Sequence, residues 1–306
     1  MRHGILRSTM TERALLLMAH GSRDAAARAE YARLRQALAE RLPGETVVFS
    51  VLEFPDSGEL PSIEEGWRRC LAAGARRVVA LPFFLFPAGH VREDLPNELE
   101  AARRGGSEAA LELLPPLGPA DELIDVIGDR AVEALGGTPD AAEEGTAVLL
   151  VGAGTSDPDA NGDLCKAARL LWERRALPLV EVAWVSLTQP TVPEGVERCL
   201  ALGARRIAVV PYFLNTGVLL RRIEARLRPL REQHPSVPMP LAAHMGLHPR
   251  LLDLLERRAR QGLQGHGPER GLVAVCGRPS CSAVAQAQAR LTQGRAAAIS
   301  GASSPY

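Results

Sequence analysis

ALLLMAHGSRD, residues 14–24, returns later in the chain as AVLLVGAGTSD, residues 147–157. CLAAGARRVVALPFFL at 70–85 is matched in the same way by CLALGARRIAVVPYFL at 199–214. Two further pairs follow the same order, PSIEEGWRRC (61–70) with PTVPEGVERC (190–199), and LPPLGPADELIDVI (114–127) with AAHMGLHPRLLDLL (242–255). Because order and spacing are both kept, the sequence predicts one domain duplicated in tandem.

Each copy alternates short apolar runs with amphipathic helical stretches. Strands are expected near 14–19, 46–54, 77–86 and 109–114, with helices near 23–41, 61–73, 90–103 and 119–135. In the second copy, strands are expected near 147–152, 178–187, 205–214 and 237–243, each followed by a helix. This alternation requires parallel strands and right-handed crossovers. The expected fold class is α/β, with two duplicated, doubly wound parallel-sheet domains that face each other across a cleft.

The predicted domain boundaries follow the repeat. An N-terminal unit spans 10–135, and a C-terminal unit spans 146–265. The stretch GGTPDAAEEG at 136–145 has the composition of a linker between them. Residues 266–306 fall outside the repeat and form an extension whose small polar end is expected to be mobile.

Charge and hydropathy exclude several classes of partner. Lys+Arg and Asp+Glu both number 36 among 306 residues, so no net charge attracts nucleic acid or a membrane surface. The N-terminus lacks the apolar segment of a signal peptide, and no apolar run reaches the length of a membrane span. We therefore expect a cytoplasmic protein without nucleic-acid or membrane partners.

The five cysteines do not form a metal or disulfide pattern. Cys70, Cys165 and Cys199 lie in helical patterns and are expected to be small buried side chains of a reduced protein. Cys276 and Cys281 are spaced C-x4-C in the C-terminal extension. They lack the tighter spacing of an iron–sulfur motif, so inert thiols are favoured over a cluster.

Metal-binding side chains follow the strands of the first copy. His20, Glu53 and His90 come at the expected ends of its first three strands, where open α/β sheets form their sites. The second copy has Ala153, Ser186 and Val218 at the matching positions, although it keeps the surrounding glycines and prolines. Because only the side chains that bind cations are lost, the sequence predicts one metal site, in the first copy.

Two imidazoles and one carboxylate form an incomplete coordination sphere for a first-row divalent ion. Structural zinc sites close with four ligands, whereas a protein that transfers its metal needs few ligands and an open side. Metal insertion into a tetrapyrrole also removes two pyrrole protons. Imidazole and carboxylate groups can accept them, so His20, Glu53 and His90 are candidates for both metal binding and catalysis.

The motifs LLLMAHGSRD, SVLEF and LPFFLFPAGHVREDLP resemble those of the sirohydrochlorin chelatase family, the class II chelatases, in its long two-unit form. The resemblance spans about 14–260. It implies insertion of cobalt for cobalamin or iron for siroheme. It also implies that the matching His20, His90 and Glu53 bind the metal and assist deprotonation. The implied substrate is a carboxylate-rich macrocycle in the cleft between the units.

Other polar residues beside the strand ends are weaker candidates for substrate binding. They are Ser22, Arg23, Arg92, Asn215 and Thr216. Arg23 and Arg92 flank the two histidines and could pair with substrate carboxylates, although the chain is rich in arginine. Asp24 is better explained as a helix cap, since the second copy keeps an aspartate at the matching position.

Three functions remain open. The favoured one is insertion of Co²⁺ into sirohydrochlorin, with iron insertion as the nearest rival, because the ligand set does not separate the two ions. A tetrapyrrole or metal carrier without catalysis is the second, and a nucleotide-binding α/β protein, which lacks its glycine motifs, is the third. The divalent metal is then a substrate, with no permanently bound cofactor, and the repeat suggests a monomer built as an internal pseudo-dimer.

Overall fold

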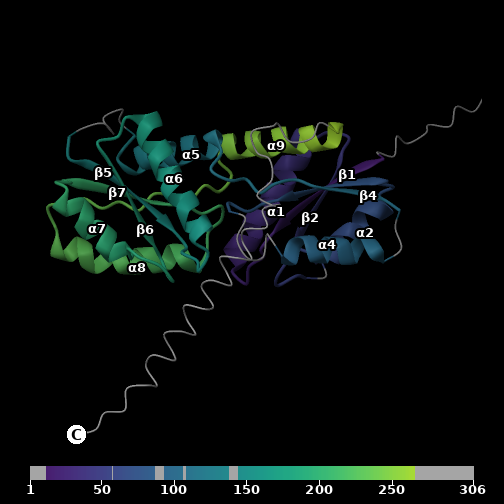
Figure 1. The fold of residues 1–306 in the computed structure, drawn as a ribbon, viewed down its shortest axis with the longest axis horizontal. Helices are drawn as coiled ribbons and strands as arrows, with labels where there is room; N and C mark the ends of the chain where they lie inside the picture. Colours follow the sequence, from purple (N-terminus) through teal and green to yellow (C-terminus); the bar gives the residue numbers. More distant parts are fainter. Residues whose placement is uncertain (1–11, 57, 87–92, 106–107, 138–143, 266–306) are drawn as a thin grey trace, which may run out of the picture. The chain divides into compact units, whose positions relative to one another are not determined.

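Strands and helices alternate along the computed structural model, which describes residues 12–56, 58–86, 93–105, 108–137 and 144–265. The first repeat contains β1 (Arg13–Ala19), α1 (Ala25–Arg41), β2 (Thr46–Val51), α2 (Ile63–Ala72), β3 (Arg77–Pro82), α4 (Asp94–Arg104), β4 (Ala110–Leu113) and α5 (Asp121–Ala134). The second contains β5 (Thr146–Gly152), α6 (Pro158–Arg175), β6 (Leu179–Trp184), α7 (Val192–Ala201), β7 (Arg206–Pro211), α8 (Val218–Gln233) and α9 (Pro249–Gln264) (Figure 1). The predicted C-terminal extension, with Cys276 and Cys281, lies outside the described residues.

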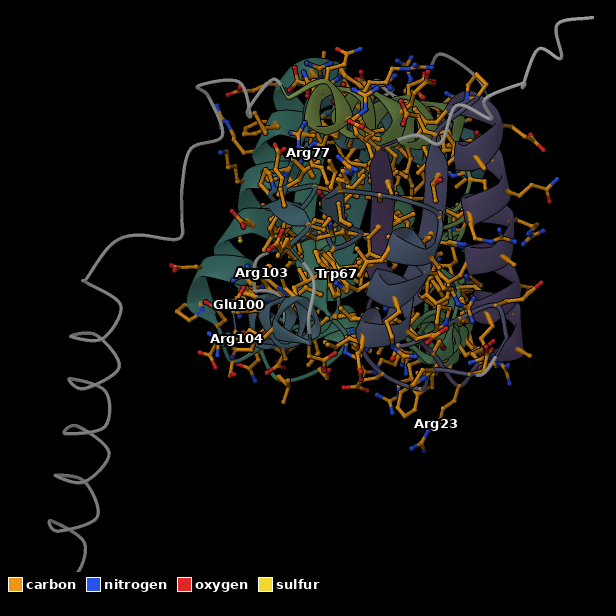
Figure 2. All side chains as sticks on the ribbon, turned by 90° about the vertical axis from the view of Figure 1, so that its right-hand side faces the viewer. Arg23, Trp67, Arg77, Glu100, Arg103 and Arg104 are labelled. Atoms are coloured by element: carbon orange, nitrogen blue, oxygen red, sulfur yellow. The ribbon has the colours of Figure 1, made fainter. Side chains whose placement is uncertain are left out.

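Both sheets are parallel, as predicted. The first has the strand order β2-β1-β3-β4 and the second β6-β5-β7. The central strands β1 and β5 are buried almost throughout, because helices cover both faces of each sheet. Among them, α2 and α4 cover one face of the first sheet, where Trp67 is fully buried in the interior (Figure 2). The α/β class with two doubly wound parallel sheets is confirmed.

The prediction of a strand near 237–243 is wrong. This segment runs beside β7 but makes only an isolated bridge between Val209 and Leu241. The carbonyls of Pro238 and Pro240 accept from Ile207 and Val209. Two prolines at alternate positions have no N–H to donate, so the ladder is interrupted where β4 of the first repeat completes it.

The last helix of each repeat packs on the sheet of the other repeat. Helix α9 lies against β1, β3 and α1 of the first repeat, and α5 lies against β7 and α6 of the second (Figure 1). Arginines at equivalent positions hold each of these helices to the other repeat by hydrogen bonds. Arg258 of α9 donates to the carbonyls of Pro116 and Leu117 at 2.7 and 2.9 Å, and Arg130 of α5 donates to those of His244 and Met245 at 3.0 and 3.1 Å. Each repeat therefore completes the other.

A second reciprocal contact joins the same helices. Arg41 of α1 pairs with Asp253 of α9 at 2.6 Å, and its counterpart Arg174 of α6 pairs with Asp125 of α5 at 3.0 Å. Reciprocal contacts between equivalent surfaces are the property of a two-fold interface, here made within one chain. The largest apolar core accordingly contains residues of both repeats, from Leu15 to Leu263.

The cysteines follow the prediction with one exception. Cys70 and Cys199 are buried, and burial raises the pKa of each thiol to about 12, so both are inert. Cys165 is exposed on α6, contrary to the expectation, because it lies on the side of the helix away from the sheet. Within the described part of the chain, no helix combines the length and apolar character needed to cross a bilayer.

Candidate metal site

His20 and Glu53 follow neighbouring strands, β1 and β2, and meet at their carboxyl ends. The His20 Nε2 atom lies 3.9 Å from Glu53 Oε1, and the side chains are 44% and 37% exposed. The Glu53 N–H donates to the His20 carbonyl at 2.7 Å, which extends the parallel pairing by one bond. The structure thus brings together two of the three predicted ligands at an edge that an incoming ion can reach.

Gly21 allows this close approach. Its φ is +98°, and a Cβ there would lie 1.9 Å from the Glu53 carbonyl oxygen. Gly154 repeats the arrangement in the second copy, with φ +85° and a Cβ position 1.8 Å from the Ser186 carbonyl oxygen. Only glycine fits a positive φ against a carbonyl at that distance. The same backbone conformation is therefore present in both copies, although the side chains beside it differ.

The second copy carries no ligands at the equivalent positions. The Ser186 N–H donates to the Ala153 carbonyl at 3.0 Å, as the Glu53 N–H does to that of His20. The Ser186 hydroxyl donates to the same carbonyl at 3.1 Å, so it is engaged within its own loop. Ala153 and Ser186 are thus the structural counterparts of His20 and Glu53, and neither offers an imidazole or a carboxylate.

The counterpart of the third predicted ligand, His90, is found by aligning the helices that follow it, α4 and α8. Buried residues of α4 have the spacing of buried residues of α8, namely Leu95, Leu99 and Ala102 against Ile223, Leu227 and Leu230. The same offset carries position 90 onto Val218, which begins α8 and is 50% exposed. His90 and Arg92 themselves lie outside the described residues, within which no three metal-binding side chains gather.

Arg28 holds both loops of the site, which the sequence did not indicate. Its Nη1 donates to the carbonyls of Ser22 at 3.4 Å and Phe54 at 3.1 Å, and its guanidinium pairs with Asp56. In the second copy Asn161 replaces it and reaches the Thr155 carbonyl at 2.7 Å. Arg28 thereby ties the loop after His20 to the loop after Glu53. One arginine in an arginine-rich helix gave no signal of this role.

Tyr31 and Phe49 also support the loop that carries His20. Tyr31 of α1 packs on Phe49 with ring centroids 5.2 Å apart, and its hydroxyl is hydrogen-bonded to the backbone of Gly21. Burial raises the pKa of Tyr31 to about 12, so the hydroxyl stays neutral. The second copy has Leu164 at this position, so the support is specific to the half that carries His20.

Arg23, predicted to contact substrate, lies 4.4 Å from the ring centroid of Phe54. Figure 2 shows it projecting outward, at the end of the first sheet opposite to Arg77. Phe54 has a φ of +53° and is 36% exposed, and its counterpart Leu187 has a φ of +65° and is 81% exposed. Such backbone costs about 1–2 kcal/mol for a residue other than glycine. Both copies therefore keep an apolar side chain in a strained position at a strand end.

The remaining weak candidates lie where the second repeat contacts α1. The Thr216 N–H donates to Glu30 at 2.9 Å, and His244 Nε2 lies 2.9 Å from the other Glu30 oxygen. Arg221 of α8 donates to Asp24 at 2.7 Å. Asn215 is half-buried beside Thr216. These contacts bring the loop after β7 and the start of α8 beside the loop that carries His20.

Ser22 and Asp24 both take part in the start of α1. The Ser22 hydroxyl accepts from the Asp24 N–H at 3.0 Å, and the Asp24 carboxylate accepts from Ala26 at 2.9 Å. Thr155 and Asp157 form the same two bonds at the start of α6. The prediction that Asp24 caps the helix is confirmed, and Ser22 supports that cap.

Known proteins share both repeats. The CbiX family description matches residues 14–134 and again 147–262. A sirohydrochlorin cobaltochelatase of Priestia megaterium is 39% identical over 207 residues, which cover 68% of this chain and 67% of that protein. A sirohydrochlorin ferrochelatase of Bacillus subtilis (strain 168) is 27% identical over 250 residues, covering 82% of this chain and 92% of that one. The sirohydrochlorin chelatase SirB from Bacillus subtilis subspecies spizizenii, solved in complex with cobalt, matches 83% of this chain and 96% of its own, with a TM-score of 0.67 and 26% identity.

Proposed function

Because the chain belongs to the CbiX family, we propose that it is a sirohydrochlorin cobaltochelatase, which inserts Co²⁺ into the macrocycle and releases two pyrrole protons. The observation that carries the proposal is the pair formed by His20 and Glu53 at the strand ends of the first repeat. The second repeat has the same backbone there without metal-binding side chains. The chemistry is thus assigned to one half of a duplicated scaffold.

In this proposal His20, Glu53 and His90 hold the arriving ion. A pair that is more than one-third exposed leaves coordination positions open, so the ion can pass to the macrocycle instead of being trapped. The same groups then receive the pyrrole protons, since a carboxylate or imidazole that loses its metal becomes a free base. The metal is therefore a substrate, and no permanently bound cofactor is needed.

The macrocycle is expected to lie over the strand ends, in the predicted cleft between the repeats. Arg23, with its guanidinium over the exposed Phe54 ring, offers a cation and a flat apolar surface to a carboxylate-rich ring. Arg92 stays a proposed contact, and so does Ser22. Asn215 and Thr216 also stay proposed contacts, and because the Thr216 N–H is bonded to Glu30, we propose that Thr216 contacts the substrate through its side chain. The expected state is a cytoplasmic monomer that works as an internal pseudo-dimer.

Iron insertion is the nearest alternative, since ferrochelatases are among the relatives and imidazole and carboxylate ligands accept both ions. The test is anaerobic incubation of the purified protein with sirohydrochlorin and either Co²⁺ or Fe²⁺, with insertion followed by absorbance. Cobalt insertion well above the uncatalysed rate, and faster than iron insertion, is the expected result. Binding of macrocycle with both rates at background would instead identify a carrier.

A further inference from the structure

The second repeat has a pocket at the position where the first repeat has Glu53. The pocket measures about 640 Å³ and is open to solvent. Its lining includes Ser186, Leu187, Thr188, Gln189, Thr191 and Arg226. This volume is within the range of small-molecule sites. No metal-binding side chain lines it, so it calls for a different ligand.

A shorter loop creates the pocket. In the first repeat, residues 54–60 connect Glu53 to Pro61, and Leu60 of this loop is a buried core residue. In the second repeat only residues 187–189 connect Ser186 to Pro190. Both loops end at an equivalent bridge, Val51 with Ser62 and Trp184 with Thr191. The strand ends are therefore superposable, and the missing loop residues leave a hollow.

Arg226 supplies the only charge in that lining. It is half-buried on α8, and one guanidinium nitrogen donates to the Val185 carbonyl. Within the described part of the chain, no carboxylate pairs with Arg226, in contrast to Arg28 and Arg221, which pair with Asp56 and Asp24. A guanidinium has five N–H donors in a fork that suits a carboxylate. Its remaining donors and its uncompensated charge favour an anionic ligand.

The pocket is linked to the metal site by α8. Arg221 of α8 pairs with Asp24 at the start of α1, four residues after His20. Arg226 follows five residues later, which is about 7.5 Å along a helix axis. Helix α8 thus contacts the start of α1 through Arg221 and lines the pocket through Arg226.

We propose that this pocket binds a peripheral carboxylate of the tetrapyrrole through Arg226, so that the second repeat orients the macrocycle while the first repeat delivers the metal. The inference rests on the proposed chelatase function. It explains why the second repeat keeps the strand-end geometry without the metal-binding groups. It also explains why its loop is short, since the first repeat's longer loop would fill the space.

Two variants test the proposal in the full-length chain. Arg226→Gln removes the charge, and Gln189→Glu adds an opposing charge on the exposed pocket wall while leaving the bond from Arg226 to Val185 intact. Arg222→Gln, at an exposed position of the same helix, is the matched control. Binding of metal-free sirohydrochlorin by absorbance titration and the kinetics of Co²⁺ insertion are measured for each, at several salt concentrations.

We expect both pocket variants to raise the Kd and KM for the macrocycle about tenfold, the loss of one charge-assisted contact. Their kcat and Co²⁺ affinity should be unchanged, and their binding should depend less steeply on salt than that of the wild type. Unchanged Kd and KM in both variants, or losses equal to that of the control, would overturn the proposal. A wild type that binds macrocycle without inserting metal would refute the chelatase function instead, and the Kd values would still decide the pocket.

Discussion

At the scale of single residues, the two repeats differ in side chains placed on the same backbone. Gly21 and Gly154 have positive φ values, and a Cβ at either would lie within 2 Å of a carbonyl oxygen, at 1.9 Å from that of Glu53 and 1.8 Å from that of Ser186. Beside them stand His20 and Glu53 in one copy, and Ala153 and Ser186 in the other. The proposed metal site therefore differs from its counterpart in a few side chains placed on the same backbone.

The glycine pair gives a direct test of this separation. Gly21→Ala and Gly154→Ala should each lower the free energy of unfolding by about 2–3 kcal/mol, because both place a Cβ against a carbonyl at positive φ. Only Gly21→Ala should also weaken Co²⁺ binding, since only that loop carries a proposed ligand, His20. Urea denaturation and Co²⁺ titration measure the two effects. Equal losses of Co²⁺ affinity in both variants would contradict the assignment.

Arg28 should act on the site through position alone. Arg28→Gln removes one tie between the His20 and Glu53 loops, and we expect about a tenfold rise in the Kd for Co²⁺, a typical effect for groups that orient metal ligands. Arg33→Gln, on the exposed side of α1, is the control. If Arg28→Gln bound Co²⁺ as the wild type does, the tie between the loops would have no functional role.

At the scale of helices and strands, most of the architecture follows from the sequence. Alternating apolar runs and capped helical stretches locate the elements, because each pattern reflects burial on a sheet or on one side of a helix. The prediction for 237–243 is wrong because the apolar residues of this segment suggest a strand, while Pro238 and Pro240 lack the N–H donors that a strand needs. The exchange of α5 and α9 was not predictable, since a repeat pattern does not say on which sheet the last helix packs.

The packing of α9 through Arg258 should contribute more to the free energy of unfolding than the packing of α5 through Arg130. Arg258 is 7% exposed and donates to three carbonyls, those of Pro115, Pro116 and Leu117. Arg258→Met leaves them without a donor and should cost about 3 kcal/mol, whereas Arg130→Met, at a more exposed position, should cost about 1 kcal/mol. Chemical denaturation of both variants gives the comparison. The reverse order would show that burial does not determine the strength of these contacts.

The contact between α1 and α8 should depend on pH. The hydrogen bond from Arg221, and then that from Ala26, hold the pKa of Asp24 below its ordinary value of 3.8. A lowered folded pKa stabilises the protein above that value, and the contribution disappears as pH falls through the folded pKa. The difference in the free energy of unfolding between wild type and Asp24→Asn should thus be largest near neutral pH. It should shrink as the pH falls below about 3.8. Urea denaturation across this range measures it, and a difference independent of pH would exclude the effect.

At the scale of the whole molecule, the chain is a two-fold arrangement that has lost its symmetry at one place. Reciprocal contacts at Arg130 and Arg258 keep the two halves equivalent as structures. The strand ends are not equivalent, since one carries the proposed ligand pair and the other an open pocket. His20 and Glu53 could be predicted because the carboxyl ends of parallel strands converge. Arg28, Phe54 and Arg226 could not, because their roles depend on contacts between loops and helices far apart in the sequence.

The central claim is that metal chemistry belongs to the first repeat alone. It is tested most directly by the rate of anaerobic Co²⁺ insertion at saturating sirohydrochlorin, compared between Glu53→Ala and Ser186→Ala. The account predicts that kcat falls about 100-fold or more in Glu53→Ala, because a ligand and proton acceptor is lost. In Ser186→Ala, where only a hydroxyl bonded within its own loop is removed, the loss of kcat should be far smaller. Comparable losses of kcat in the two variants would contradict the account.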